Sequence, residues 1–248
     1  MFLAVENKFN IREIVLIIGG TIVTSRKWVK LFLRTLLWGG LSTLIISFFV
    51  KSDAYMEALQ PFNAFGLLGV VLTFLGFGFI FSIISQMGFF AYLTVHQFGL
   101  GMFRRFWVPI QIGLIAFALF DLVYFRYRDV EGDPSIWPYF IAPVLIFIYG
   151  WIVATIKARE TNKNAFIPAL FFMVVVTSVE WVPALQAGDQ DYVLLMIFPL
   201  LLCNTYQILL LHRLTTLGND QESTTESKQQ PSSSNKSKKP KKKKGKRK

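Results

Sequence analysis

The chain has 248 residues, of which 53% are hydrophobic, 16% are aromatic and only 17% are charged. So few charges cannot cover the surface of a soluble domain of this length. The net charge of +11 lies mostly at the C-terminus, because ten of the thirteen residues from Lys236 to Lys248 are Lys or Arg. A single cysteine, Cys203, excludes an intramolecular disulfide and metal sites built on cysteine clusters.

The first apolar run, residues 11–23, is too short to cross a bilayer. A signal peptide is also excluded, because Glu6 and Glu13 stand where a basic segment should be and no small-residue cleavage site follows. Residues 1–22 are therefore interpreted as a doubtful N-terminal extension. Two hypotheses for it stay open: a translated stretch ahead of a true start at Val23, or a short amphipathic surface helix.

Six longer apolar runs follow, each close to the roughly 20 residues that a helix needs to cross the bilayer. They cover residues 31–50, 62–86, 107–125, 137–156, 165–184 and 192–212. A lone span satisfies its backbone hydrogen bonds only as a helix, and the alternation typical of an outer-membrane barrel is absent. The sequence therefore predicts an all-α, multi-pass protein of the cell membrane, with six transmembrane helices in residues 23–217.

The distribution of charges predicts the orientation of these spans. One set of connections is rich in basic residues: Arg26, Lys27, Lys30, Arg34, Arg104, Arg105, Lys157, Arg159, Lys163 and Arg213. The alternate connections are mainly acidic: Asp53, Glu57, Asp129, Glu131, Asp133, Asp189 and Asp191. Basic connections stay in the cytoplasm, so both termini are predicted to be cytoplasmic.

The second run is unusually long, because residues 62–103 contain no charged side chain at all. We expect the crossing at residues 62–86, with residues 87–103 lying along the cytoplasmic face or re-entering it. A second crossing inside residues 62–103 is the alternative. It would give seven spans and would place Arg104 and Arg105 outside, against the charge rule.

The C-terminal segment, residues 218–248, is poor in apolar residues and rich in Ser, Thr, Gln and Lys. This composition predicts a disordered, polybasic cytoplasmic tail. Lys236–Lys248 are expected to meet anionic lipid headgroups before any nucleic acid, and no specific nucleic-acid partner is expected. A solvated, dispensable tail is the competing interpretation.

Two acidic residues, Asp121 and Glu180, lie nearest the predicted bilayer, near the outer ends of the third and fifth spans. Ionisable groups at such depths are candidates for function. For Asp121 the simpler interpretation is an ion pair with Arg126 or interfacial hydration. His96 has no cysteine or second histidine near it, so a metal site is not expected, and no catalytic motif is present. The sequence predicts no enzyme, no cofactor and no metal.

Three segments carry a resemblance to a known family. They are TSRKWVKLFLRTLLWGGLSTLI (residues 24–45), FSIISQMGFFAYLTVHQFGLGMFR (81–104) and ALFDLVYFRYR (118–128). They resemble the KinB-signalling pathway activation proteins of spore-forming Gram-positive bacteria, over about residues 24–212. The matched positions are Ser85, Gln86, Gly88, Tyr92, His96, Gly99, Gly101, Asp121, Tyr124 and Arg126.

The resemblance implies a multi-pass accessory protein, without catalytic residues, that the membrane histidine kinase KinB needs in order to feed the sporulation phosphorelay. The expected partner is then a KinB-like sensor kinase. We expect the contact surface in residues 87–105 and adjoining positions, with four candidate residues: Gln86, His96, Arg104 and Arg105. The alternative is a small transporter or channel that uses Asp121 and Glu180.

Overall fold

The computed structural model describes residues 25–128 and 137–229, which fold into helices joined by short turns, with no strand among them. The helices are α2 (Ser25–Val50), α3 (Ser52–Leu59), α4 (Ala64–Phe103), α5 (Trp107–Arg128), α6 (Trp137–Glu160), α7 (Phe166–Phe171), α8 (Thr177–Ala187) and α9 (Gln190–Gln229). Three short elements complete the order: the 3-10 turns η1 (Arg104–Phe106) and η2 (Lys163–Ala165), and the π-helical η3 (Phe172–Val176). The predictions for residues 1–22 and Lys236–Lys248 lie outside the described residues.

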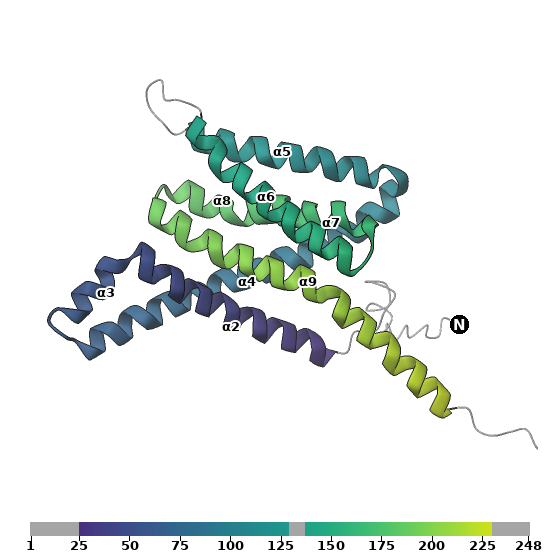
Figure 1. Ribbon diagram of the computed structural model, residues 1–248, viewed down its shortest axis with the longest axis horizontal. Helices are drawn as coiled ribbons and strands as arrows, with labels where there is room; N and C mark the ends of the chain where they lie inside the picture. Colours follow the sequence, from purple (N-terminus) through teal and green to yellow (C-terminus); the bar gives the residue numbers. More distant parts are fainter. Residues whose placement is uncertain (1–24, 129–136, 230–248) are drawn as a thin grey trace, which may run out of the picture.

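The helices form a bundle with α8 and α9 in the middle. Figure 1 shows α2 with α4 on one side of this pair and α5 with α6 on the other. Burial follows the same order. The apolar stretch that includes α7 and α8 has 56% of its residues buried, and the apolar stretch of α9 has 50%. The corresponding share is 28% in α2 and 28% in α6. The residues of α8 and α9 therefore decide what lies at the centre of the molecule.

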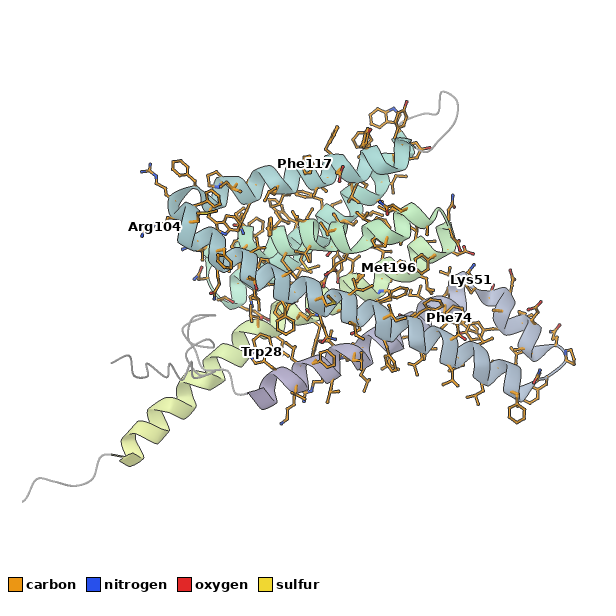
Figure 2. The ribbon with its side chains drawn as sticks, turned by 180° about the vertical axis from the view of Figure 1, so that it is seen from behind. Trp28, Lys51, Phe74, Arg104, Phe117 and Met196 are labelled. Carbon is orange, nitrogen blue, oxygen red and sulfur yellow. The ribbon has the colours of Figure 1, made fainter. Side chains whose placement is uncertain are left out.

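The connections between helices gather at two opposite ends of the bundle. The α2–α3–α4 connection and the turn between α8 and α9 lie at one end, and η1 and η2 lie at the other (Figure 1). Lys51 and Arg104 accordingly appear at opposite ends in Figure 2. At the first end, Lys51 Nζ donates to Asp191 Oδ2 at 2.6 Å and ties the α2–α3 corner to the start of α9. This hydrogen bond raises the pKa of Lys51 above its ordinary value.

Large apolar side chains cover the outside of the bundle. Phe65, Phe98 and Met102 on α4 are 88%, 72% and 73% exposed, and Trp137 on α6 is 78% exposed. Within the described residues, five segments are long and apolar enough to cross a membrane, by length and composition. One of the five, Ala64–Tyr124, has 61 residues and contains both α4 and α5.

Helix α4 differs from the prediction. It runs without a break for 40 residues, so residues 87–103 continue the helix that residues 64–86 begin. At about 1.5 Å per residue its length is about 60 Å. A surface-lying or re-entrant segment is therefore wrong, and so is a second crossing inside residues 62–103. The sequence contains glycines here but no proline, and glycine alone does not stop a helix that tertiary contacts support.

Helix α9 also continues further than predicted. Residues 218–229 were expected to be disordered, yet they extend α9 to Gln229. After Gly218 this stretch has no proline or glycine and contains Gln, Glu and Lys, which favour a helix. Figure 1 shows this end of α9 extending beyond the other helices.

Helices α2 and α4 approach each other most closely where glycines face one another. A Cβ atom added to Gly78 would lie 2.7 Å from Gly40 Cα and 2.8 Å from the Gly39 carbonyl oxygen. A Cβ atom added to Gly39 would lie 2.6 Å from Ser82 Cβ. The two backbones can touch only because these positions lack side chains, which is the way small residues bring apolar helices together.

Candidate functional site

The four predicted contact residues differ from one another in how exposed they are. Gln86 is only 5% exposed and donates to Ser82 Oγ at 3.2 Å, so it lies inside the bundle and not on a surface. His96 is half-buried. Arg104 and Arg105 are exposed in η1, where Figure 2 shows Arg104 at the end of α4.

The η1 turn is held by a buried tryptophan. Trp107 is 4% exposed, its Nε1 donates to His96 Nδ1 at 3.1 Å, and its ring stacks on Phe103 at 6.3 Å. Arg104 has φ of 41°, which is rare for a residue with a side chain. His96 therefore supports the turn from inside, and the two arginines are presented on a fixed backbone.

This anchoring leads to the first prediction. A Cβ atom at Gly99 would lie 2.4 Å from the Trp107 ring, whereas Gly101 has nothing within 4 Å. We expect Gly99→Ala to displace Trp107 and lower the stability of the protein by about 1–3 kcal/mol, as overpacking does. Gly101→Ala is the matched control and should change little. Thermal unfolding in detergent, followed by tryptophan fluorescence, measures both, and equal midpoints would contradict the packing of Trp107 on Gly99.

The two predicted intramembrane acids also differ in their surroundings. Asp121 is half-buried on α5. The side chain of Arg126, its predicted partner, lies outside the described side chains. Glu180 on α8 is only 6% exposed, so its side chain is buried inside the protein. Glu180 is thus the predicted residue that lies at the centre of the bundle.

A π-helical turn precedes Glu180. Phe172, Met173 and Val174 of this turn are completely buried, and the regular α-helix resumes at Thr177. A π turn inserts an additional residue into the helical repeat and changes which side chains face the core, and such turns are frequent at functional sites. In α8 the residues that follow the turn, Thr177 and Glu180, both point into the bundle and are buried.

Four polar side chains from α4, α8 and α9 form a continuous hydrogen-bonded cluster with Glu180. Asn204 Nδ2 donates to Glu180 Oε2 at 2.7 Å and to Thr177 Oγ1 at 2.9 Å. Ser85 Oγ donates to Asn204 Oδ1 at 2.7 Å and accepts from Gln207 Nε2 at 2.9 Å. We call Ser85, Thr177, Glu180, Asn204 and Gln207 the polar cluster. Its members are buried, and it joins three helices at the centre of the molecule.

Gly88 completes the site from α4. A Cβ atom there would overlap Glu180 Oε1 and would lie 2.9 Å from Val176 Cγ1. The carboxyl group can therefore lie against the α4 backbone only because residue 88 is glycine. Oε1 itself makes no hydrogen bond to any described residue, while Oε2 accepts from Asn204.

The sequence interpretation missed most of the polar cluster. Ser85 was noted only as a matched position, and Thr177, Asn204 and Gln207 were not singled out. The available signal was the presence of uncharged polar residues inside apolar runs, since such side chains commonly hydrogen-bond between helices. Within residues 25–128 and 137–229, His, Cys, Asp and Glu form no group of three that could hold a metal ion.

Comparison with known proteins gives one family. Residues 39–214 match the KbaA family, described as KinB-signalling pathway activation in sporulation. A KinB-signaling pathway activation protein of Bacillus subtilis (strain 168) is 42% identical over 190 residues, which cover 75% of this chain and 96% of that protein. No solved structure matches the chain. All five residues of the polar cluster, together with Gly88 and the η1 turn, fall inside the matched residues. The chain therefore belongs to the family of KinB-signalling pathway activation proteins.

Proposed function

We propose that this protein is a non-enzymatic membrane accessory of a KinB-like sensor histidine kinase in the sporulation pathway. The observation that carries the proposal is the 42% identity to a KinB-signaling pathway activation protein along nearly its whole length. An accessory of this kind activates a kinase by binding its active state more tightly than its inactive state. It therefore needs a defined contact surface and no catalytic group.

The fold supports a location in the cell membrane with six spans. Helices α2, α4, α5, α6, the α7–α8 segment and α9 run back and forth between the two ends of the bundle (Figure 1). Arg104, Arg105 and Lys163 stand exposed at one end, and Lys51 and Asp191 pair at the other. By the positive-inside rule, we infer that η1 and η2 lie on the cytoplasmic side, which agrees with the prediction that both termini are cytoplasmic.

The η1 turn is the proposed contact with the kinase. Arg104 and Arg105 are exposed beside the apolar side chains of Met102 and Phe106, which are 73% and 67% exposed. The buried Trp107 holds the turn in one conformation, so little freedom is lost when a partner binds. A rigid turn with two cations and apolar neighbours suits an acidic, partly apolar segment of the kinase at the membrane surface.

The second prediction tests this contact. We expect Arg104→Glu with Arg105→Glu to abolish KinB-dependent sporulation and to leave the amount of protein in the membrane unchanged, because charge reversal repels an acidic partner. The matched control is Arg159→Glu with Lys163→Glu, which makes the same charge change at other exposed positions at the same end. Counts of heat-resistant spores give the result, and reporter fusions verify the orientation in both strains.

A strain whose phosphorelay runs through a different kinase separates this function from others. Deleting the protein there should matter little, and the kinase should co-purify with the unchanged protein but not with the Arg104, Arg105 variant. If the deletion blocks sporulation equally in both strains, the accessory function is wrong. Equal loss in the Arg159, Lys163 control would show that net charge, and not η1, is what matters.

A transporter remains the alternative from another functional class, and the arrangement of the acids favours it less. The large groove of about 970 Å³ lies between α6 and the α8–α9 pair and is lined mostly by aliphatic and aromatic side chains. Neither Asp121 nor Glu180 lines it. The two acids also belong to different surroundings, since Asp121 is half-buried on α5 and Glu180 sits in the polar cluster.

A further inference from the structure

The carboxyl group of Glu180 has two very different oxygen atoms. Oε2 accepts a hydrogen bond from Asn204 Nδ2, whereas Oε1 is buried against Gly88 without a hydrogen-bond partner among the described residues. An ionised carboxylate with a bare, buried oxygen is costly, because burial removes the water that would stabilise the charge.

The direction of hydrogen bonds in the polar cluster gives the second observation. Gln207 donates to Ser85, Ser85 donates to Asn204, and Asn204 donates to Thr177 and Glu180. Both amide hydrogens of Asn204 are thereby used, and only one of them reaches the carboxyl group. A single neutral donor suits the carbonyl oxygen of a carboxylic acid. A carboxylate would accept at both oxygens.

Charged groups near Glu180 do not change this conclusion. The elements packed against α8 are α4, α5, α9 and η3. Helix α4 and η3 carry no Asp, Glu, Lys or Arg. On α5 the described ionisable side chains are Asp121, Tyr124 and Tyr127. On α9 the ionisable side chains next to Asn204 and Gln207 in the sequence are Cys203 and Tyr206. In the described part of the chain, no cation is paired with Glu180.

We propose that Glu180 is a proton-binding site and that the closed packing of α4 on α8 requires the bound proton. Binding forms the Oε1–H bond and converts the carboxylate to a neutral acid. Release leaves an anion whose Oε1 faces the α4 backbone at Gly88. The anion then needs water or a cation, and either one has to enter between α4 and α8. The α4–α8 contact at Gly88 therefore fits the neutral acid and not the bare anion.

The role of Gly88 follows from this arrangement. A proton on Oε1 lets the carboxyl group pack against the helix without a charge, and glycine leaves room for the oxygen. The same α4 ends at the η1 turn, 16 residues after Gly88. The proton site stands independently of the kinase contact, because it rests on the polar cluster alone.

Infrared spectroscopy of the full chain in an ester-free detergent tests the site directly. At about pH 8, the ionised form of an exposed carboxyl group outnumbers the protonated form by about a thousand to one or more. We expect the wild-type protein still to show a carboxylic C=O stretching band there, and we expect Glu180→Gln to remove it. Asp121→Asn is the matched control, because it removes the second of the two acids that the sequence places nearest the bilayer. It should leave the band in place. If Glu180→Gln does not accumulate, Glu180→Asp serves instead, because it keeps an acid and should shift the band.

Three outcomes would overturn the proposal. The first is a wild-type spectrum without the band at this pH. The second is a band that Asp121→Asn removes and Glu180→Gln leaves. The third is loss of the band when sodium replaces choline in the buffer, which would make Glu180 a sodium site. A band that is insensitive to sodium, lost in Glu180→Gln and retained in Asp121→Asn supports a bound proton.

Discussion

Gly78→Val is expected to separate α2 from α4 and to reduce the amount of folded protein severely. Even the first carbon of a side chain at position 78 would lie 2.7–2.8 Å from Gly40 Cα, the Gly39 carbonyl oxygen and Thr43 Oγ1. Two of these three atoms belong to the backbone, which cannot turn aside as a flexible side chain does. Overpacking typically costs about 1–3 kcal/mol, and valine at a backbone crossing should reach or exceed the upper value.

Gly76→Val is the matched control for this prediction. It lies two residues away on the same helix, and a Cβ atom there has nothing within 4 Å. Both variants add the same β-branched side chain to α4, so helix propensity and hydrophobicity change equally. The amount of protein in purified membranes and the midpoint of thermal unfolding measure the difference. Similar values for the two variants would show that α2 and α4 do not cross at Gly78.

Hydropathy was enough to predict most of the helices. The runs at residues 107–125 and 137–156 correspond to α5 (Trp107–Arg128) and α6 (Trp137–Glu160) within a few residues. Long apolar stretches leave few alternatives to a helix, since their backbone must hydrogen-bond to itself. The same reasoning failed at residues 87–103, because an average over a window detects apolar composition but not where a helix ends.

The polar cluster could not be predicted in the same way. Asn204 and Gln207 stand three residues apart in an apolar run, and their sequence does not indicate that Ser85, more than a hundred residues earlier, lies between them in space. The π turn before Thr177 also has no sequence signal of its own. Glu180 was found because it is charged, and its uncharged partners were missed because hydropathy gives them little weight.

Asn204→Leu is expected to be the most damaging single change in the polar cluster. It removes three hydrogen bonds, to Ser85, Thr177 and Glu180. Hydrogen bonds between helices in membrane proteins contribute about 0.6–1.7 kcal/mol each, so a loss of about 2–5 kcal/mol is expected. Thr205→Val on the same helix is the graded control, because it removes one bond between helices, to Tyr149 Oη, and one bond within α9, to the Leu201 carbonyl oxygen. An unfolding midpoint no lower for Asn204→Leu than for Thr205→Val would contradict the cluster.

The double variant Asn204→Leu with Glu180→Leu then separates the stability of the polar cluster from the proton site. Removing one member of a buried polar pair leaves the other unsatisfied, whereas replacing both by apolar side chains of similar size can be nearly neutral. We expect the double variant to regain the part of the stability that an unpaired Glu180 costs in Asn204→Leu, while Ser85 and Thr177 still lack their bonds to Asn204. It should nevertheless lack the carboxylic C=O band at about pH 8, because no acid remains at position 180. A stable double variant that keeps the band would show that Glu180 is not the protonated acid.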